Sequence, residues 1–159
     1  MAEGVVTRSV SNLHYVLVGG RTVVCPARGR FRREGHRVLT GDRVKVSLDA
    51  GGTGVIERIL PRTSLLRRPP VANVDQAVVV FTLVEPELSP VVVDRLVVQA
   101  EEAGLSVVLC LNKTDLVEPA DLEPLKARFA PAGYPLLPTS ARDGTGLGAL
   151  RSVLAGKVS

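Results

Sequence analysis

The chain has 159 residues, 45% of them hydrophobic and 23% charged, which suits one ordinary folded domain or two small ones. It contains no apolar run long enough to span a membrane and no charged-then-apolar signal segment, so we expect a cytoplasmic protein without a membrane partner. The net charge of +4 is unevenly distributed along the chain. Residues 1–70 hold 13 Lys and Arg against 5 Asp and Glu, whereas residues 71–159 hold 7 Lys and Arg against 11 Asp and Glu. This asymmetry predicts a basic unit facing a polyanion and a second unit with other partners.

Five runs bearing Val and Leu follow one another in the first seventy residues, divided by turn residues. They are Glu3–Val10, Leu13–Val18, Arg21–Ala27, Arg43–Leu48 and Gly54–Leu60. Strands at this spacing, with no helical periodicity between them, predict a small closed β-barrel. Five strands in so short a span favour an all-β, OB-like barrel, although an SH3-like barrel would give a similar pattern.

A basic segment of ten residues lies between the third and fourth of these runs. Its five arginines are Arg28, Arg30, Arg32, Arg33 and Arg37. A basic loop on a small barrel is typical of a phosphate-contacting surface, because neutralised phosphates release counterions. A charged loop kept only for solubility is the alternative. Since only Tyr15 and Phe31 could stack on bases, the sequence favours shape and backbone contacts to folded RNA over the reading of a single strand.

The segment Leu65-Leu-Arg-Arg-Pro-Pro70 follows the last expected barrel strand. Two prolines after two arginines predict a stiff extended connector. We therefore expect one domain over residues 1–70, an OB-like RNA-binding barrel with a basic connector, and a second domain over residues 71–159.

The second half of the chain alternates strand patterns with helix patterns. We expect strands at Gln76–Val84, Ser106–Leu111 and Leu136–Leu137, and helices at 89–103, from Asp121 through Phe129, and around Leu147, Leu150 and Leu154. This order predicts a parallel sheet with right-handed crossovers in an α/β domain. The run Gly144-Thr-Gly-Leu-Gly148 is interpreted as a helix-entry turn, because it lacks the third glycine and the long preceding strand of a dinucleotide fingerprint.

Polar residues follow the strand 106–111 directly, as Asn112-Lys113-Thr114-Asp115. Ligands of α/β proteins bind where parallel strands end. The two oxygens of Asp115 can accept from two adjacent N–H donors, and guanine carries such a pair whereas adenine does not. Asn112 can tie the loop to neighbouring backbone, and the aliphatic stem of Lys113 can lie over a purine face.

A second strand-to-loop boundary follows about 25 residues later, at Thr139-Ser140-Ala141. Small residues at this point allow a backbone N–H to approach the oxygen of a purine. Each segment alone could be a loop that merely caps a helix. Together and in this order, they predict a guanine-binding site made of Asn112, Lys113, Asp115, Ser140 and Ala141.

The chain contains no Gly-x-x-x-x-Gly-Lys-[Ser/Thr] sequence for holding phosphates, and no Asp-x-x-Gly segment after a strand. Cys25 and Cys110 fall in apolar runs, so we expect free buried thiols and no disulfide. His14 and His36 stand at no metal-ligand spacing from them, so zinc is not supported within this chain.

Several stretches of the sequence resemble the ribosome small-subunit-dependent GTPase A (RsgA) family of circularly permuted GTPases, in which the base-recognition motifs precede the phosphate loop. The resemblance covers essentially the whole chain, and its most specific stretches are Arg28-Gly-Arg-Phe-Arg32, Thr40-Gly-Asp-Arg-Val44, Arg67-Arg-Pro-Pro-Val-Ala-Asn-Val-Asp-Gln76, Asp94-Arg95, Leu111-Asn-Lys-Thr-Asp-Leu116 and Thr139-Ser-Ala141.

This resemblance implies an OB barrel that contacts rRNA of the small ribosomal subunit, joined to part of a GTPase domain acting late in subunit maturation. It implies that Asn112, Lys113 and Asp115 recognise guanine, while Ser140 and Ala141 contact the base oxygen through backbone. It also implies GTP or GDP with Mg²⁺ in the complete protein, and zinc only in a C-terminal domain of the family. We expect a truncated, monomeric chain, without catalytic residues or metal ligands, that does not hydrolyse GTP alone.

Two other functions remain open at this stage. One is a non-catalytic RNA-binding OB module whose degenerate nucleotide domain serves as a platform for partners. The other is an ATP-using enzyme, which conflicts with Asp115 because adenine lacks the paired donors that a carboxylate can accept.

Overall fold

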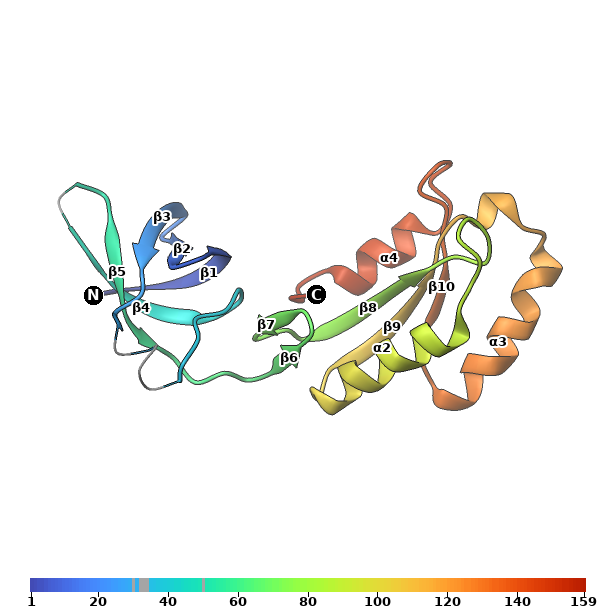
Figure 1. Ribbon diagram of the computed structural model, residues 1–159. Helices are drawn as coiled ribbons and strands as arrows, with labels where there is room; N and C mark the ends of the chain where they lie inside the picture. Colours follow the sequence, from blue (N-terminus) through green and yellow to red (C-terminus); the bar gives the residue numbers. More distant parts are fainter. Residues whose placement is uncertain (30, 32–34, 50) are drawn as a thin grey trace. The chain divides into compact units, whose positions relative to one another are not determined.

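The computed structural model describes residues 1–29, 31, 35–49 and 51–159. It divides into two compact units, Met1–Val74 and Asp75–Ser159. The first unit is built from strands, and the second alternates strands and helices (Figure 1). Within the described residues, no helix is long and apolar enough to span a membrane.

The first unit contains a five-stranded antiparallel sheet in the order β3-β2-β1-β4-β5. Its strands are β1 (Ala2–Val10), β2 (Leu13–Val18), β3 (Arg21–Pro26), β4 (Arg43–Leu48) and β5 (Gly54–Ile59). A parallel bridge joins Ala27, just after β3, to Ile56 in β5, so the two outer strands of the curled sheet meet at this point. The OB-like five-stranded fold predicted from the spacing of the runs is confirmed.

The interior of this unit is small and built almost entirely from aliphatic side chains. Alternate residues of the strands point inward, because successive side chains of a strand face opposite sides of a sheet. The buried cluster consists of Val6, Val16, Cys25, Phe31, Val38, Val44, Val46 and Ile56. Phe31 is its one aromatic member, so the basic segment that carries it is anchored to the barrel at that residue.

A short hairpin stands where a stiff extended connector was expected. Strand β6 (Leu65–Arg67) pairs antiparallel with β7 (Pro70–Ala72), and Ala72 N donates to Thr40 O over 2.9 Å. Gly41 has φ +87°, and a Cβ there would lie 2.0 Å from Ala72 O, so only glycine allows this approach. Asn73 completes the attachment, because its side chain accepts from Thr63 N over 2.9 Å and donates to Gly41 O over 2.8 Å. The chain thus folds back on the barrel as far as Val74.

A buried ion pair joins the segments before β4 and after β5. The fully buried carboxylate of Asp42 accepts from Leu39 N over 2.8 Å and from Arg62 Nε over 2.7 Å. A second nitrogen of Arg62 donates to Asp42 Oδ2 and to the carbonyl of Arg37. The hydrogen bond to Asp42 raises the pKa of Arg62. The sequence analysis did not identify this pair.

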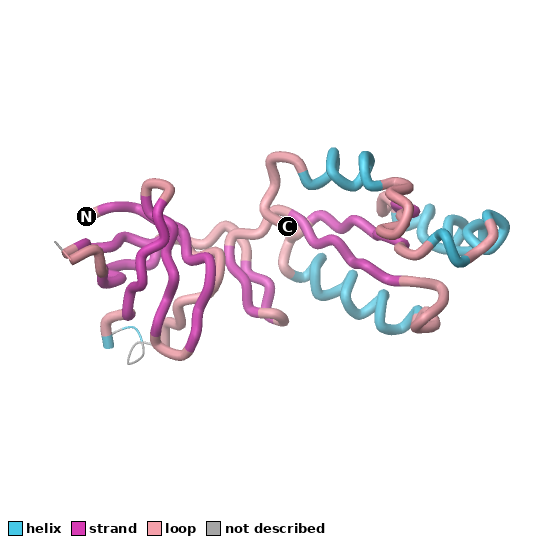
Figure 2. Tube along the Cα trace, turned by 90° about the horizontal axis from the view of Figure 1, so that it is seen from above, coloured by secondary structure: helices cyan, strands magenta, loops and turns pink. Residues whose placement is uncertain are grey.

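The second unit has a parallel three-stranded sheet in the order β10-β9-β8. Helix α2 lies on one side of the strands and α4 on the other (Figure 2). The elements are β8 (Gln76–Phe81), α2 (Pro90–Glu102), β9 (Ser106–Leu111), the 3₁₀ turns η1 (Thr114–Leu116) and η2 (Pro119–Leu122), α3 (Glu123–Phe129), η3 (Ala130–Ala132), β10 (Leu136–Pro138) and α4 (Leu147–Leu154). The predicted α/β organisation is confirmed.

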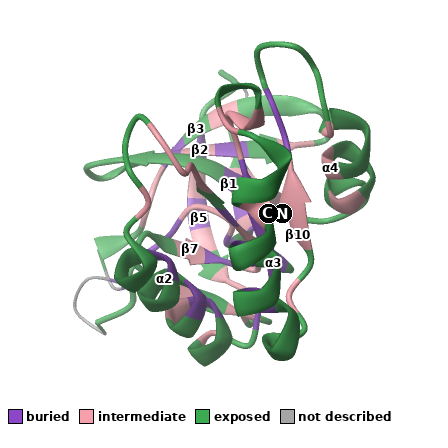
Figure 3. Cartoon of the chain, turned by 90° about the vertical axis from the view of Figure 1, so that its right-hand side faces the viewer, coloured by how far each residue is buried: buried purple, intermediate pink, exposed green. Residues whose placement is uncertain are grey.

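Burial in this unit is greatest in the central strand. All residues of β9 after Ser106 are buried, as expected for a strand flanked by two others and covered by helices. Figure 3 shows the buried stretches along the strands and the inner side of α2, whereas α3 is largely exposed. Asp121, the expected start of this helix, lies before α3. It belongs to the preceding turn η2, and its carboxylate accepts from Glu118 N over 2.9 Å.

The end of the chain is fastened to the beginning of β8. The buried amide of Gln76 donates to Val153 O over 3.1 Å and to Ser159 Oγ over 2.8 Å. Asp75 Oδ2 accepts from Val158 N over 2.8 Å, and Asp75 N donates to Val158 O over the same distance. These bonds supply a structural role for Asp75, which the sequence analysis had left without one.

We predict that Asp42→Ala lowers the free energy of unfolding of the first unit by about 3 kcal/mol, because it leaves the Leu39 N–H and the Arg62 guanidinium without their buried partner. Denaturant unfolding of the 159-residue chain measures the change. Glu3→Ala is the matched control: its carboxylate is half exposed and lies 3.6 Å from Arg43, so its loss should cost under about 1 kcal/mol. Equal effects of the two substitutions would contradict the prediction.

Candidate functional site

The two polar loops predicted to bind a ligand follow adjacent parallel strands. Leu136–Pro138 of β10 pairs in register with Leu109–Leu111 of β9. Both strands therefore end at the same edge of the sheet, and Asn112 and Thr139 leave it side by side. The register alone brings together two segments that lie about 25 residues apart in the sequence.

Backbone hydrogen bonds hold the two loops against each other. Thr139 N donates to Leu111 O over 2.7 Å, and Thr114 N donates to Thr139 O over 3.1 Å. The hydroxyl of Thr114 donates to the same carbonyl over 3.0 Å. Lys113 has the left-handed conformation, with φ 62° and ψ 37°, which turns the chain so that Thr114 faces the second loop. Asn112 N donates to Phe81 O over 2.8 Å and so connects the first loop to β8 as well.

Side chains of the predicted site also bond across the two loops. Ser140 Oγ donates to Asp115 Oδ1 over 2.7 Å, and Ala141 N donates to Asn112 Oδ1 over 3.1 Å. Ser140 is fully buried, whereas 15% of the Asp115 side-chain surface remains exposed. The carboxylate thus accepts a hydrogen bond from a buried hydroxyl and keeps part of its own surface exposed.

The carboxylate of Asp115 retains capacity for further donors. Each of its oxygens can accept two hydrogen bonds, and Ser140 occupies one position on Oδ1. Arg142 lies 3.8 Å from Oδ2, but its side chain is 81% exposed, and an exposed pair at this distance contributes little. Two adjacent N–H donors of a ligand could therefore bind both oxygens after displacing water and Arg142.

The backbone N–H groups expected to meet a purine oxygen already have partners. Ser140 N donates to Thr145 O over 2.9 Å, and Ala141 N donates to Asn112 Oδ1. Of the two, only the Ala141 N–H donates to a side chain. The Asn112 side chain can rotate, or it can share this N–H with another acceptor. Lys113 Nζ donates to Glu85 O, which links the end of this side chain to the loop after β8.

The loop after Ser140 is shaped by residues that the sequence analysis did not assign to the site. Asp143 N donates to Ser140 Oγ over 3.3 Å, and Thr145 N donates to Asp143 Oδ1 over 2.8 Å. Hydrogen bonds from the side chain and the backbone of Thr145 lower the pKa of Asp143. Gly146 has φ +72°, and a Cβ there would lie 2.1 Å from Pro138 O. Glycine is therefore required for α4 to begin directly after this contact with β10. The sequence predicted a helix-entry turn here but not the contact with Pro138 that requires glycine.

The predicted RNA-binding arginines lie in the first unit, and only two of them are among the described residues. Arg30, Arg32 and Arg33 lie outside the described residues. Arg28 makes a bidentate bond to Glu57, with Nε 2.6 Å from Oε2 and the second nitrogen 2.7 Å from Oε1. Arg37 has an exposed side chain and, within the described part of the chain, makes no ion pair.

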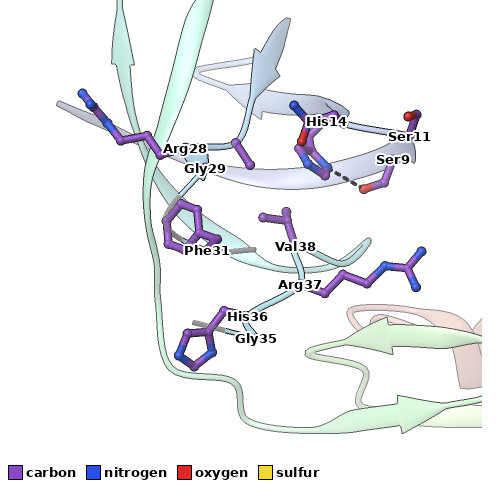
Figure 4. Close-up of a pocket in the computed structure, with 12 residues that line it drawn as sticks. Ser9, Ser11, His14, Arg28, Gly29, Phe31, Gly35, His36, Arg37 and Val38 are labelled. Atoms are coloured by element: carbon purple, nitrogen blue, oxygen red, sulfur yellow. Dashed lines mark hydrogen bonds between the residues drawn. The ribbon is translucent and has the colours of Figure 1, made fainter. Parts of the chain in front are cut away.

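A cavity of about 680 Å³ opens beside this basic segment (Figure 4). Ser9, Ser11 and His14 line one side of it, and Arg28, Phe31, His36 and Arg37 line the other. Among the described residues, no group of His, Cys, Asp and Glu could hold a metal ion. Cys25 and Cys110 are both buried free thiols, as expected.

Comparison with known proteins decides the family. The family model described as RsgA N-terminal domain matches residues 3–56, and the model described as RsgA GTPase matches residues 59–159. The chain belongs to the RsgA GTPase family. The resemblance stated from the sequence motifs is confirmed, and the two matched segments follow the same division into a barrel and an α/β unit.

Similar proteins include several curated members of this family, which function in biogenesis of the small ribosomal subunit according to their names. "Small ribosomal subunit biogenesis GTPase RsgA" of Thermotoga neapolitana is 42% identical over 142 residues, covering 88% of this chain and 48% of the relative. The protein of the same name from Caldanaerobacter subterraneus is 38% identical over 157 residues, covering 99% and 53%. The chain spans about half the length of these relatives.

Two solved structures share the fold of this chain. YjeQ from Thermotoga maritima has a TM-score of 0.85 at 38% identity, covering 98% of this chain and 58% of that one. YloQ, described as a circularly permuted GTPase, has a TM-score of 0.79 at 32% identity, covering 99% and 57%.

We predict that Gly146→Ala destabilises the second unit by at least about 2 kcal/mol, because the added Cβ meets Pro138 O and alanine disfavours a positive φ. Denaturant unfolding of the 159-residue chain measures the loss. Gly148→Ala is the matched control. Gly148 lies in α4 with open space around its Cβ position, so this substitution should leave the free energy of unfolding unchanged or raise it by about 0.5–1 kcal/mol. A neutral Gly146→Ala would contradict the described loop.

Proposed function

We propose that the second unit recognises the guanine base of GTP or GDP. Asp115 accepts from guanine N1–H and the 2-amino group, and Lys113 lies along the purine face. The Ala141 N–H exchanges the amide oxygen of Asn112 for the oxygen of the base. The observation that carries this proposal is the bond between Ser140 Oγ and Asp115 Oδ1, because it presents a partly exposed carboxylate beside the Ala141 N–H.

We further propose that GTP hydrolysis, with Mg²⁺, belongs to the complete family protein, in which other residues hold the phosphates. The 159 residues contain the base-recognition motifs but no Gly-x-x-x-x-Gly-Lys-[Ser/Thr] sequence. Base contacts alone give weak binding, because phosphate contacts normally contribute much of a nucleotide's affinity. We expect this chain by itself to bind guanine nucleotides weakly, without turnover.

We propose that the first unit binds rRNA of the small ribosomal subunit and that the protein acts late in maturation of that subunit. The names of the curated relatives support this assignment, since they are small ribosomal subunit biogenesis GTPases. The excess of basic residues in residues 1–70 supports a polyanionic partner. A non-catalytic RNA-binding module is the competing function, and it predicts no preference of the second unit for guanine over adenine.

We predict that Asp115→Asn weakens guanosine binding about tenfold or more and favours xanthosine, because the amide replaces one accepting oxygen by an NH₂ donor, which cannot pair with the 2-amino group of guanine but can donate to the 2-oxo group of xanthine. Amide chemical shifts near Ala141, followed by NMR during titration of the 159-residue chain, detect such weak binding. Adenosine should cause no comparable shifts.

Asp94→Asn is the matched control for this experiment, because it neutralises a half-exposed carboxylate on α2 that pairs with Arg128. It should bind guanosine like the unchanged chain. Equal shifts with guanosine and adenosine, or an unchanged preference in Asp115→Asn, would contradict the guanine site and favour the non-catalytic module.

We also predict that replacing Arg32 and Arg37 by Ala weakens binding to small-subunit RNA and reduces the slope of log affinity against log salt by about one for each lost phosphate contact. Replacing Arg95 and Arg151 removes the same charge from exposed positions of the second unit and is the control. Filter binding at a series of salt concentrations measures both. RNA binding that is insensitive to salt would contradict the proposed interface.

A further inference from the structure

The cavity in the first unit is formed by two segments that face each other (Figure 4). One wall comes from the end of β1, the turn after it and the start of β2, with Ser9, Ser11, Asn12 and His14. The opposite wall comes from described residues between β3 and β4, among them Arg28, Phe31 and Arg37. The cavity volume, about 680 Å³, is within the range of small-ligand sites, about 300–1,000 Å³, and exceeds what a single amino-acid side chain fills.

The first wall carries polar groups suited to the edge of an uncharged ring. Ser9 Oγ and His14 Nδ1 share a hydrogen bond of 2.9 Å, which fixes the orientation of the imidazole. His14 is buried, and desolvation lowers its pKa, although the charge of Asp42 opposes the shift. The lowered pKa favours the neutral imidazole, which carries no charge for phosphate. Asn12 adds an exposed amide, which can both donate and accept.

The opposite wall combines an apolar floor with cationic side chains. Ala27, Phe31 and Val38 contribute the floor, and both Phe31 and Val38 belong to the buried cluster of the barrel. Arg28 and Arg37 also line the cavity. The bidentate bond to Glu57 holds the Arg28 guanidinium in one orientation, while half of its side-chain surface stays exposed. The Arg28 and Arg37 side chains extend outward from the cavity on different sides of it, whereas the groups of Ala27, Phe31 and Val38 are apolar (Figure 4).

This order of groups matches a nucleotide that enters base first. A base has apolar faces and a hydrogen-bonding edge, whereas its phosphates are anionic and remain at the mouth. We propose that this cavity receives one unpaired base of a folded RNA, while Arg28 and Arg37 contact the adjoining phosphates. The inference rests on the proposed RNA-binding function of the first unit and refines it, because shape and backbone contacts alone would need no cavity.

A set of RNA hairpins with one stem sequence tests the inference. One hairpin is fully paired, four carry a single unpaired A, C, G or U in the stem, and one carries an abasic residue at that position. We expect the 159-residue chain to bind at least one of the four bulged hairpins about tenfold more tightly than the paired hairpin. The abasic hairpin should bind like the paired one, because it has the flexible backbone but no base.

Variants of cavity residues test whether the preference for a bulged hairpin over the paired hairpin arises from the cavity. Ser9→Ala with Asn12→Ala removes two polar groups of the first wall, and the ratio between bulged and paired hairpins should fall to about one. Thr7→Ala is the control, because Thr7 is an exposed residue of β1 that does not line the cavity and whose hydroxyl donates to Tyr15 O. It should keep the full ratio. Far-ultraviolet circular dichroism and the unfolding midpoint show whether each variant is folded.

The outcomes separate the inference from the function on which it rests. If no hairpin and no small-subunit RNA binds, the RNA-binding function itself is wrong. If all hairpins bind equally, or the abasic hairpin equals the best bulged one, the barrel binds RNA but the cavity takes no base. Binding of free AMP, CMP, GMP or UMP as tightly as the best bulged hairpin would also overturn the inference, because the site would then serve free nucleotides.

Discussion

The parallel pairing of β9 with β10 is the constraint on which the proposed nucleotide site depends. The two strands end in register, so Asn112 and Thr139 leave the sheet at neighbouring points. Every cross-loop bond of the site follows from this register, including the bond between Asp115 and Ser140. A strand that slipped by one residue would also reverse the direction of its side chains. The buried aliphatic residues of β9 hold the register, and they thereby hold the site.

A second organising feature is the use of buried polar groups where the aliphatic cores end. Asp42 satisfies a backbone N–H and an arginine in the first unit, and Gln76 binds the chain end in the second. Hydrogen bonds depend on direction, so such groups fix the geometry of loops more closely than aliphatic contacts do. Both residues lie in or beside segments that the sequence analysis assigned to the family motifs without a physical explanation.

The sequence was sufficient to predict most of the elements, because their signals are local. Strand spacing predicted the barrel, and the alternation of apolar runs with periodic helices predicted the parallel sheet. Asn112, Lys113, Asp115, Ser140 and Ala141 were grouped from position and chemistry, and the structure brings them to one edge. The prediction that was wrong concerned a segment whose hydrogen-bond partners include a residue distant in the sequence. The prolines after Arg68 indicated an extended connector, but pairing with β6 and the bond to Thr40 fold this segment back.

Contacts across many residues explain the other omissions. Nothing near Asp42 in the sequence identifies Arg62 as its partner, and the requirement for glycine at position 146 arises from the carbonyl of Pro138. The aromatic ring of Phe31 was considered for stacking on bases, yet it belongs to the buried cluster and is only 8% exposed. A residue in a basic segment can thus serve mainly as its anchor, which a pattern of charges alone does not reveal.

The geometry of the proposed guanine site favours discrimination over affinity. Asp115 must release water and its contact with Arg142 before it accepts from a base, and Ala141 N must release Asn112, so much of each new bond replaces an existing one. Because new bonds replace existing ones, the net binding free energy gained with guanine is small. The loss for a wrong base is larger, because a carboxylate that has lost water would face a ring without paired donors. The proposed site would therefore select guanine, and tight binding would have to come from contacts to the rest of the nucleotide.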